Sequence, residues 1–162
     1  MAPVKKLNSH ILLDIGCGSA KHGPNWVGLD KRYIEGIVDI CHDIESTPLP
    51  VRANSCKSVR MSHVVEYIDP RKIISVFDDI WRMLCSDGFL IIEAYYTGNS
   101  EVSSDPEAFR HGLTEDFFSY FDIRSDAYKI YRPKPYIVSK LTYTVGGDIY
   151  VEMSPVKNKT GA

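Results

Sequence analysis

Residues 10–30 read HILLDIGCGSAKHGPNWVGLD, and this stretch decides the fold. One apolar run, Ile11–Ile15, leads into a glycine-rich turn, and a second, Trp26–Leu29, ends at Asp30. Short and almost wholly apolar runs are typical of strands that are buried on both faces of a parallel sheet. The stretch therefore predicts two parallel strands joined by a glycine loop. An acidic residue at the end of the second strand is the arrangement that binds a nucleoside ribose.

The rest of the chain continues this alternation. A helix is predicted over 70–84, because Asp69 suits the N-cap, Pro70 suits the first helical position and Gly88 lies where a C-terminal cap would be. We therefore expect an α/β, Rossmann-like, doubly wound domain, with a mostly parallel twisted sheet and an antiparallel C-terminal edge. The elements predicted after the glycine loop are strands at 37–40, 59–62 and 89–94, helices at 70–84 and 114–121, and antiparallel strands within 127–155.

Composition limits the classes of protein that fit. A chain of 162 residues with 44% hydrophobic content fits one domain over 1–162, with a core of about 10–155 and a polar C-terminal tail. A net charge of -2 disfavours a nucleic-acid partner, and no apolar run is long enough to cross a membrane. The first ten residues lack a signal-peptide core, so we expect a cytoplasmic protein. The four scattered cysteines predict reduced thiols, and no spacing predicts a metal site.

The glycine loop distinguishes between nucleoside ligands. The third glycine of the dinucleotide pattern is missing, and only Ser19–Asn25 separates Gly18 from the second strand. At most one helical turn fits there, whereas a pyrophosphate is held by the amino-terminal end of a proper helix. S-adenosylmethionine carries no phosphate. It needs backbone that lies close to its ribose and amino-acid portions, a carboxylate for the ribose hydroxyls, and negative or aromatic surroundings for its sulfonium cation. The loop therefore favours S-adenosylmethionine, and the sequence contains no P-loop motif.

Five ordered motifs support this ligand. LLDIGCGS, VGLD, DICHDIESTPLPVRANS, SHVVEYI and LCSDGFLII together resemble the class I S-adenosylmethionine-dependent methyltransferases. The sequence is most similar to small Methyltransf_11-type proteins with a shortened first crossover, over about Ile11–Ala94. The resemblance implies a methyltransferase that converts S-adenosylmethionine to S-adenosylhomocysteine and methylates an unidentified acceptor. The sequence departs from the family at Glu66–Tyr67, where members often read E-H, and at Ser86–Gly88, where they often read P-G-G.

The resemblance also implies roles for individual residues. Asp14 would steer the cofactor's ammonium group, and Gly16 and Gly18 would line its methionine portion. Asp30 would accept from the ribose hydroxyls and Asp43 from the adenine amino group. The full set of implied cofactor-binding residues is Asp14, Gly16, Cys17, Gly18, Asp30, Asp43, Ile44, Ser62 and His63.

Methyl transfer needs an aligned acceptor and, for some nucleophiles, a base. His63 is the first candidate, because the fourth strand's end faces the methyl group in this family; a buried structural histidine is the alternative. Tyr96 follows the fifth strand and can stack on an acceptor or simply pack. His111 can act as a base or be a solvated loop residue. Glu66 can bind a cationic acceptor or open an ordinary turn.

The cofactor pocket has few segments available to cover it. Because the first strand begins near residue 11, only the loop Tyr95–Leu113 can close over the site. We therefore expect an open site for a bulky acceptor, or a lid from a homodimer or another partner subunit. Two rival functions remain. One is a catalytically silent S-adenosylmethionine-binding partner or activator subunit. The other, a nicotinamide-dependent oxidoreductase, is disfavoured by the short crossover.

Overall fold

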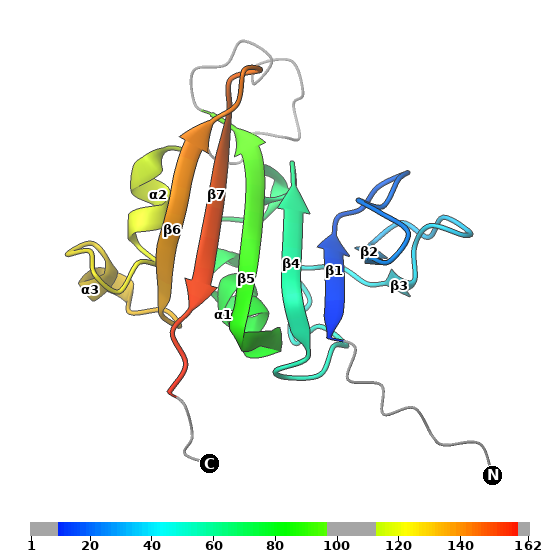
Figure 1. Ribbon diagram of the computed structural model, residues 1–162, viewed down its shortest axis with the longest axis horizontal. Coiled ribbons are helices and arrows are strands. Elements are labelled where there is room, and N and C mark those ends of the chain that lie inside the picture. Colours follow the sequence, from blue (N-terminus) through cyan, green and yellow to red (C-terminus); the bar gives the residue numbers. More distant parts are fainter. Residues whose placement is uncertain (1–9, 97–112, 159–162) are drawn as a thin grey trace.

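The computed structural model describes residues 10–96 and 113–158, which form a seven-stranded sheet in the order β3-β2-β1-β4-β5-β7-β6 (Figure 1). The strands are β1 (Ile11–Ile15), β2 (Val27–Asp30), β3 (Ile40–Cys41), β4 (Cys56–Ser62), β5 (Leu84–Tyr95), β6 (Tyr136–Tyr143) and β7 (Asp148–Pro155). The helices are η1 (Val65–Tyr67), α1 (Ile73–Met83), α2 (Glu115–Ser119) and α3 (Tyr128–Tyr131).

The pairing of the strands confirms the predicted mostly parallel sheet with an antiparallel C-terminal edge. The five strands from β3 to β5 all pair in parallel, whereas β7 runs antiparallel to both β5 and β6. The chain turns back between β6 and β7 at a turn that contains Gly146 and Gly147. The order reverses between β1 and β4, and such a reversal in an open parallel sheet opens a crevice at the carboxyl ends of the strands.

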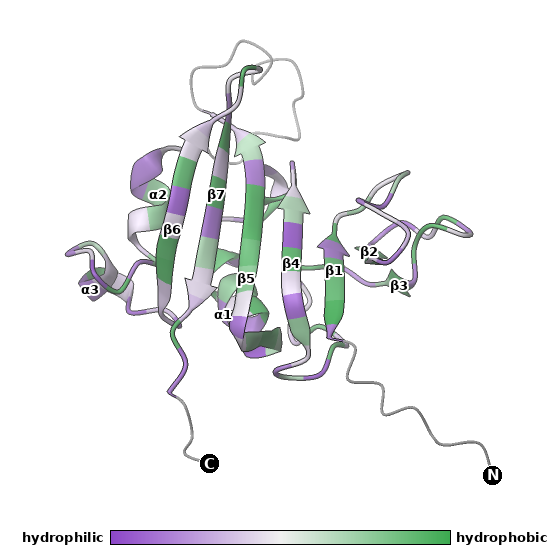
Figure 2. Ribbon diagram, viewed as in Figure 1, coloured by the Kyte–Doolittle hydropathy of each residue, from purple (hydrophilic) through white to green (hydrophobic). Residues whose placement is uncertain are grey.

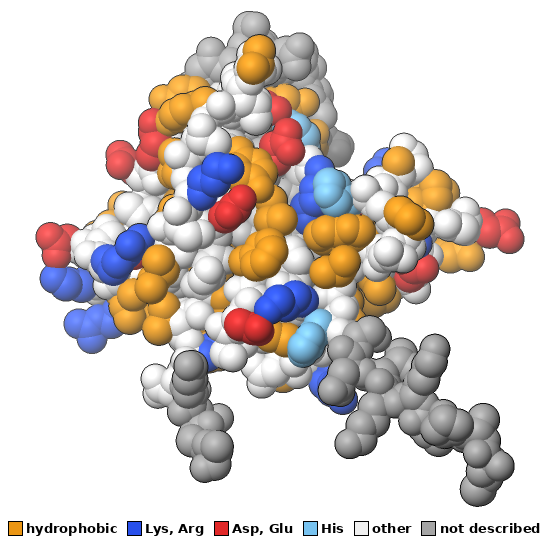
Figure 3. Space-filling view, in the orientation of Figure 1, with side chains coloured by type: hydrophobic (Ala, Val, Ile, Leu, Met, Phe, Trp, Pro, Cys, Tyr) orange, Lys and Arg blue, Asp and Glu red, His pale blue; other side chains and the backbone are white. Residues whose placement is uncertain are grey.

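The two faces of the sheet differ in how they are covered. In β5, Leu90 and Ile92 are fully buried, whereas Ile91 and Glu93 on the other face are half-buried and Phe89 is 37% exposed. The buried face packs against α1 and α2, which lie behind the sheet in Figures 1 and 2. Hydrophobic and charged side chains lie together on the other face (Figure 3). In the described part of the chain, the fold is therefore wound on one face rather than on both.

The missing helical layer has a local cause. The connection 16–26 between β1 and β2 contains turns and bends but no helix, as its length predicted. It packs across β1 instead, where the backbone N–H of His22 donates to the buried Asp14 carboxylate at 2.8 Å. The following connections, up to residue 55, also form no helix.

The ends of α1 differ from the prediction. The helix begins at Ile73, and the Asp69 carboxylate does not cap it but binds the backbone and guanidinium of Arg71. β5 follows α1 directly, so Gly88 lies inside this strand rather than at a cap. A Cβ atom on Gly88 would lie 2.9 Å from the Cys56 carbonyl oxygen, so glycine permits the close approach of β5 to β4.

Two further observations complete the fold. α3 is a single turn within the segment expected to be strand-rich, and it ends at Arg132 in the left-handed conformation. Among the described residues, none of the helices has the length and apolar character that a membrane span requires.

Candidate functional site

A pocket of about 630 Å³ lies at the carboxyl ends of β1, β2 and β4, where the strand order reverses. Five of the predicted cofactor-binding residues line it. Its volume falls within the range that is usual for small-molecule sites. The lining residues are Ile15, Gly16, Leu29, Asp30, Lys31, Arg32, Asp43, Ile44, Glu45, His63, Val64, Tyr67 and Ile68.

Asp30 connects the glycine loop to the end of β2. Its side chain is almost fully buried, and its Oδ2 accepts a hydrogen bond from the backbone N–H of Gly18 at 3.0 Å. Its Oδ1 accepts from the N–H of Arg32 at 2.9 Å. Since a carboxylate has about four acceptor positions, Asp30 retains capacity for a ligand's hydroxyl groups.

Gly16 shows why the loop needs glycine. Its φ is +68°, a conformation that favours glycine, and a Cβ atom there would collide with the Val64 side chain. Gly18 also has a positive φ, of +57°, but it faces open space. The backbone at Gly16 thus forms a wall of the pocket, opposite the first residues after β4.

Four predicted cofactor residues do not line this pocket. The Asp14 carboxylate lies under the β1–β2 connection, 3.3 Å from Nη1 of Arg60. Cys17 is buried, and burial raises the pKa of its thiol. Gly18 is held at the Asp30 carboxylate, and Ser62 is half-buried at the end of β4.

His63, directly after β4, lies among acidic groups. Its φ is +52°, and its backbone N–H donates to the Glu93 carbonyl at 2.7 Å. Its Nδ1 lies 3.5 Å from Glu66 Oε1, and its Nε2 lies 3.4 Å from Asp148 Oδ2. The Glu66 carboxylate raises the pKa of the imidazole, although partial burial opposes this shift. The ring also packs on Tyr95, with centroids 4.3 Å apart.

The other two predicted catalytic residues are Tyr96 and His111, and the structure describes only Tyr96. Tyr96 is half-buried and packs edge-on against Tyr143, with centroids 5.1 Å apart. It is not among the residues that line the pocket, whereas its neighbour Tyr95 contacts His63. His111, together with Arg110 and most of the loop predicted to cover the site, lies outside the described residues.

Sequence reasoning missed three charged residues beside His63. Arg60 and Glu93 project from the open face of the sheet, and Asp148 begins β7 directly opposite Tyr95. The sequence signal for Asp148 is the glycine turn that precedes it. A strand that runs antiparallel to β5 begins beside the carboxyl end of β5, and Asp148 is the first residue of such a strand. Using that signal requires the register between β5 and β7, which the sequence does not specify.

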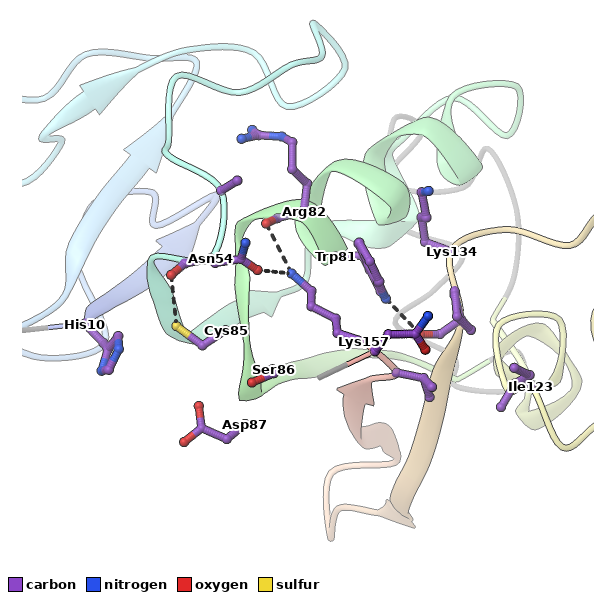
Figure 4. Close-up of a pocket in the computed structure, with 14 residues that line it drawn as sticks. His10, Asn54, Trp81, Arg82, Cys85, Ser86, Asp87, Ile123, Lys134 and Lys157 are labelled. Atoms are coloured by element: carbon purple, nitrogen blue, oxygen red, sulfur yellow. Dashed lines mark hydrogen bonds between the residues drawn. The ribbon is translucent and has the colours of Figure 1, made fainter. Parts of the chain in front are cut away.

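A second cavity, of about 1210 Å³, lies near the C-terminal end of α1 (Figure 4). Its polar groups bind one another: Lys157 Nζ donates to Asn54 Oδ1 at 2.7 Å, and Trp81 Nε1 donates to the Pro135 carbonyl at 3.0 Å. None of the predicted site residues lines it. These contacts indicate a structural role.

Comparison with known proteins identifies the fold. No protein-family model and no curated protein matches the sequence. A type 11 methyltransferase from Sulfolobus solfataricus matches with a TM-score of 0.59 and 15% identity, over 94% of this chain and 87% of the other. An S-adenosylmethionine-dependent methyltransferase from Methanosarcina mazei matches with a TM-score of 0.58 and 15% identity, over 91% of this chain and 92% of the other.

A third solved structure comes from a complex. The Haloferax volcanii methyltransferase bound to its activator Trm112 gives a TM-score of 0.63 and 12% identity, over 91% of this chain and 83% of the other. The chain therefore has the Rossmann-like fold of the class I S-adenosylmethionine-dependent methyltransferases. At these identities the likeness shows the fold.

Proposed function

We propose that this protein is an S-adenosylmethionine-dependent methyltransferase that releases S-adenosylhomocysteine. The observation that carries the proposal is the pocket of about 630 Å³ at the carboxyl ends of β1, β2 and β4, which Gly16 and Asp30 line. In open α/β sheets, nucleosides bind in this crevice.

The chemistry of the pocket fits this cofactor. The Gly16 backbone allows close approach, and the Asp30 carboxylate retains acceptor positions for ribose hydroxyls. Ile44 and Ile68 offer apolar surface for an adenine ring, beside the acceptor Asp43. The connection after β1 provides no helix end for a pyrophosphate, which favours a phosphate-free nucleoside.

When bound, the cofactor supplies a methyl group on a positively charged sulfur. The chain's own residues would position the cofactor and the acceptor. Asp14, Cys17 and Gly18 do not line the pocket, and we expect the cofactor's amino-acid portion to extend from it toward them, with the transferable methyl group near Ser62 at the end of β4. His63 would orient the acceptor or take its proton at Nε2, and Tyr96 and His111 would approach the acceptor from the region after β5.

A substitution at Asp30 tests this proposal. Asp30→Asn should weaken S-adenosylmethionine binding about tenfold or more, because an amide loses the charge-assisted hydrogen bonds to the ribose. Isothermal titration calorimetry measures the dissociation constant. Asp39→Asn is the matched control, since Asp39 also accepts from a backbone N–H, that of Gly28 at 2.8 Å, and pairs with Lys21 at 3.0 Å. Asp39 does not line the pocket.

Equal weakening by both substitutions would contradict the assignment of Asp30, because it would reflect loss of strand stability. Catalysis is tested by incubation with the methyl-labelled cofactor and fractionated cell extract. Tight binding without transfer to any fraction would instead support the silent activator subunit. The complex of the Haloferax volcanii methyltransferase with Trm112 makes a partner protein a relevant addition to this assay.

A further inference from the structure

Three potential metal ligands meet on the open face of the sheet, beside the cofactor pocket. His63 follows β4, Glu93 lies in β5 and Asp148 begins β7. One ligand atom from each lies within 4.8 Å of the others. Strand pairing fixes this meeting, because Ser62 pairs with Glu93 and Tyr95 pairs with Asp148. All three side chains are partly exposed, so an ion has access from solvent.

Among the described residues, carboxylates outnumber cationic groups around His63. Glu66, Glu93 and Asp148 bring three carboxylates to the imidazole and its surroundings. Arg60 lies 4.0 Å from Glu93, but it is closer to Asp14, at 3.3 Å. Even with His63 protonated, these named groups have two more negative than positive charges. A divalent cation would neutralise that excess.

Glu66 is the buried carboxylate behind the His63 ring. It is fully buried, and its side chain is directed at the imidazole, with Oε1 3.5 Å from His63 Nδ1. Oε1 accepts a hydrogen bond from the Tyr95 N–H at 2.6 Å. Within the described residues, however, Oε2 is buried and has no hydrogen-bond partner, and neither has His63 Nδ1. A buried carboxylate is costly without a hydrogen bond or a positive charge nearby, and the Nδ1–H of a metal-bound His63 would supply that hydrogen bond.

The arrangement also has the outer shell of a metal site. A metal-bound histidine commonly directs its other ring nitrogen at a carboxylate, which fixes the orientation of the ring. Glu66 occupies that position at Nδ1, while Nε2 faces Asp148 at 3.4 Å.

We propose that His63 Nε2, Glu93 and Asp148 bind a divalent cation of the Mn²⁺ type, with Glu66 as the orienting carboxylate. Carboxylates suit Mn²⁺ and imidazole suits first-row transition ions, so the mixed set favours these over Ca²⁺. Three protein ligands leave coordination positions for water or an acceptor oxygen. His63 would then orient an acceptor through the ion. The proposal concerns binding and does not depend on methyl transfer.

Mn²⁺ is the suitable probe, because Zn²⁺ would also bind the free cysteines of this chain. Electron paramagnetic resonance of free Mn²⁺, with tag-free protein and no methyl donor, measures the bound fraction. We expect one ion per chain with a dissociation constant below about 0.1 mM, and weaker binding of Ca²⁺. Glu93→Gln should remove the site, and Glu66→Gln should weaken it about tenfold.

Asp87→Asn is the control, because Asp87 is an exposed carboxylate in an ion pair with Lys57, away from the three ligands. It should leave Mn²⁺ affinity unchanged. Thermal melts should show that each variant is folded. Two results would overturn the proposal: no saturable Mn²⁺ uptake by the wild-type protein, or uptake that Glu93→Gln and Glu66→Gln leave intact.

Discussion

The carboxylate of Asp122 is enclosed by hydrogen-bond donors from two segments of the chain. It accepts from the backbone and guanidinium of Arg124, at 2.9 and 2.6 Å, and from the N–H of Val138 in β6 at 3.1 Å. These donors, with Arg124 first, lower the pKa of Asp122 from 3.8 to about 2. A carboxyl whose pKa is lower in the folded than in the unfolded state stabilises the fold when it is ionised.

Asp122→Asn should therefore lower the free energy of unfolding at neutral pH by on the order of 2 kcal/mol, from the size of that pKa shift. The contribution is complete above the unfolded-state pKa of about 4 and is lost as the pH falls through about 2. Urea unfolding at pH 7 and near pH 2 measures it. A difference between wild type and variant that stays constant over this range would contradict the argument.

The sequence predicts the site residues that lie within a local motif, and it misses those that the register between paired strands brings together. Gly16, Asp30 and Asp43 line one pocket because each lies at or just beyond the end of a strand whose apolar run is visible in the sequence. Glu93 and Asp148 become neighbours of His63 only through pairing between strands.

Among the elements, the C-terminal end of α1 binds a lysine that follows the last strand, β7. Lys157 Nζ donates to the carbonyl of Arg82 at 3.3 Å, where the helix ends (Figure 4). It also donates to the carbonyl of Leu84, the first residue of β5, at 2.5 Å. It also lies 4.3 Å from the centre of the Trp81 ring. Carbonyl groups at a helix end lack intrahelical donors, and a cation there is favourable. Lys157 thereby attaches the segment after β7 to α1.

Lys157→Met should lower the free energy of unfolding by about 1–3 kcal/mol, because it removes the donor and keeps most of the aliphatic contact with Trp81. Chemical unfolding followed by tryptophan fluorescence measures the change. Lys129→Met is the matched control: Lys129 forms an exposed ion pair with Asp126, which should contribute little. Equal effects of the two substitutions would show that Lys157 is not a cap.

The elements also show where local sequence signals fail. β1, β2 and the core of β5 are predicted because buried parallel strands are continuous apolar runs. The predicted start of α1 is wrong by three residues, because residues 70–72 form a turn, closed by the bond from the Lys72 N–H to the Asp69 carbonyl, before the regular helix begins. Gly88 looks like a helix cap, but its place in β5 follows from close approach to β4. That contact is tertiary and leaves no local signal.

For the whole molecule, the shortened first crossover is the decisive feature. It contributes no helix to the sheet, and Phe89 and Ile91 of β5 are partly exposed on the face opposite α1 and α2. It also removes the helix end that would hold a phosphate. The sequence predicted both the fold class and this short connection. It did not predict that the described helices lie on one face, because the remaining crossovers contain turns whose structure depends on packing.

This crossover suits a phosphate-free, positively charged nucleoside better than a phosphorylated one. Isothermal titration calorimetry of the wild-type protein with S-adenosylmethionine, and separately with NADH and ATP, distinguishes the two kinds of ligand. We predict saturable heat with S-adenosylmethionine and none with the two phosphorylated nucleotides. Strong binding of NADH or ATP, with no heat from S-adenosylmethionine, would contradict the account.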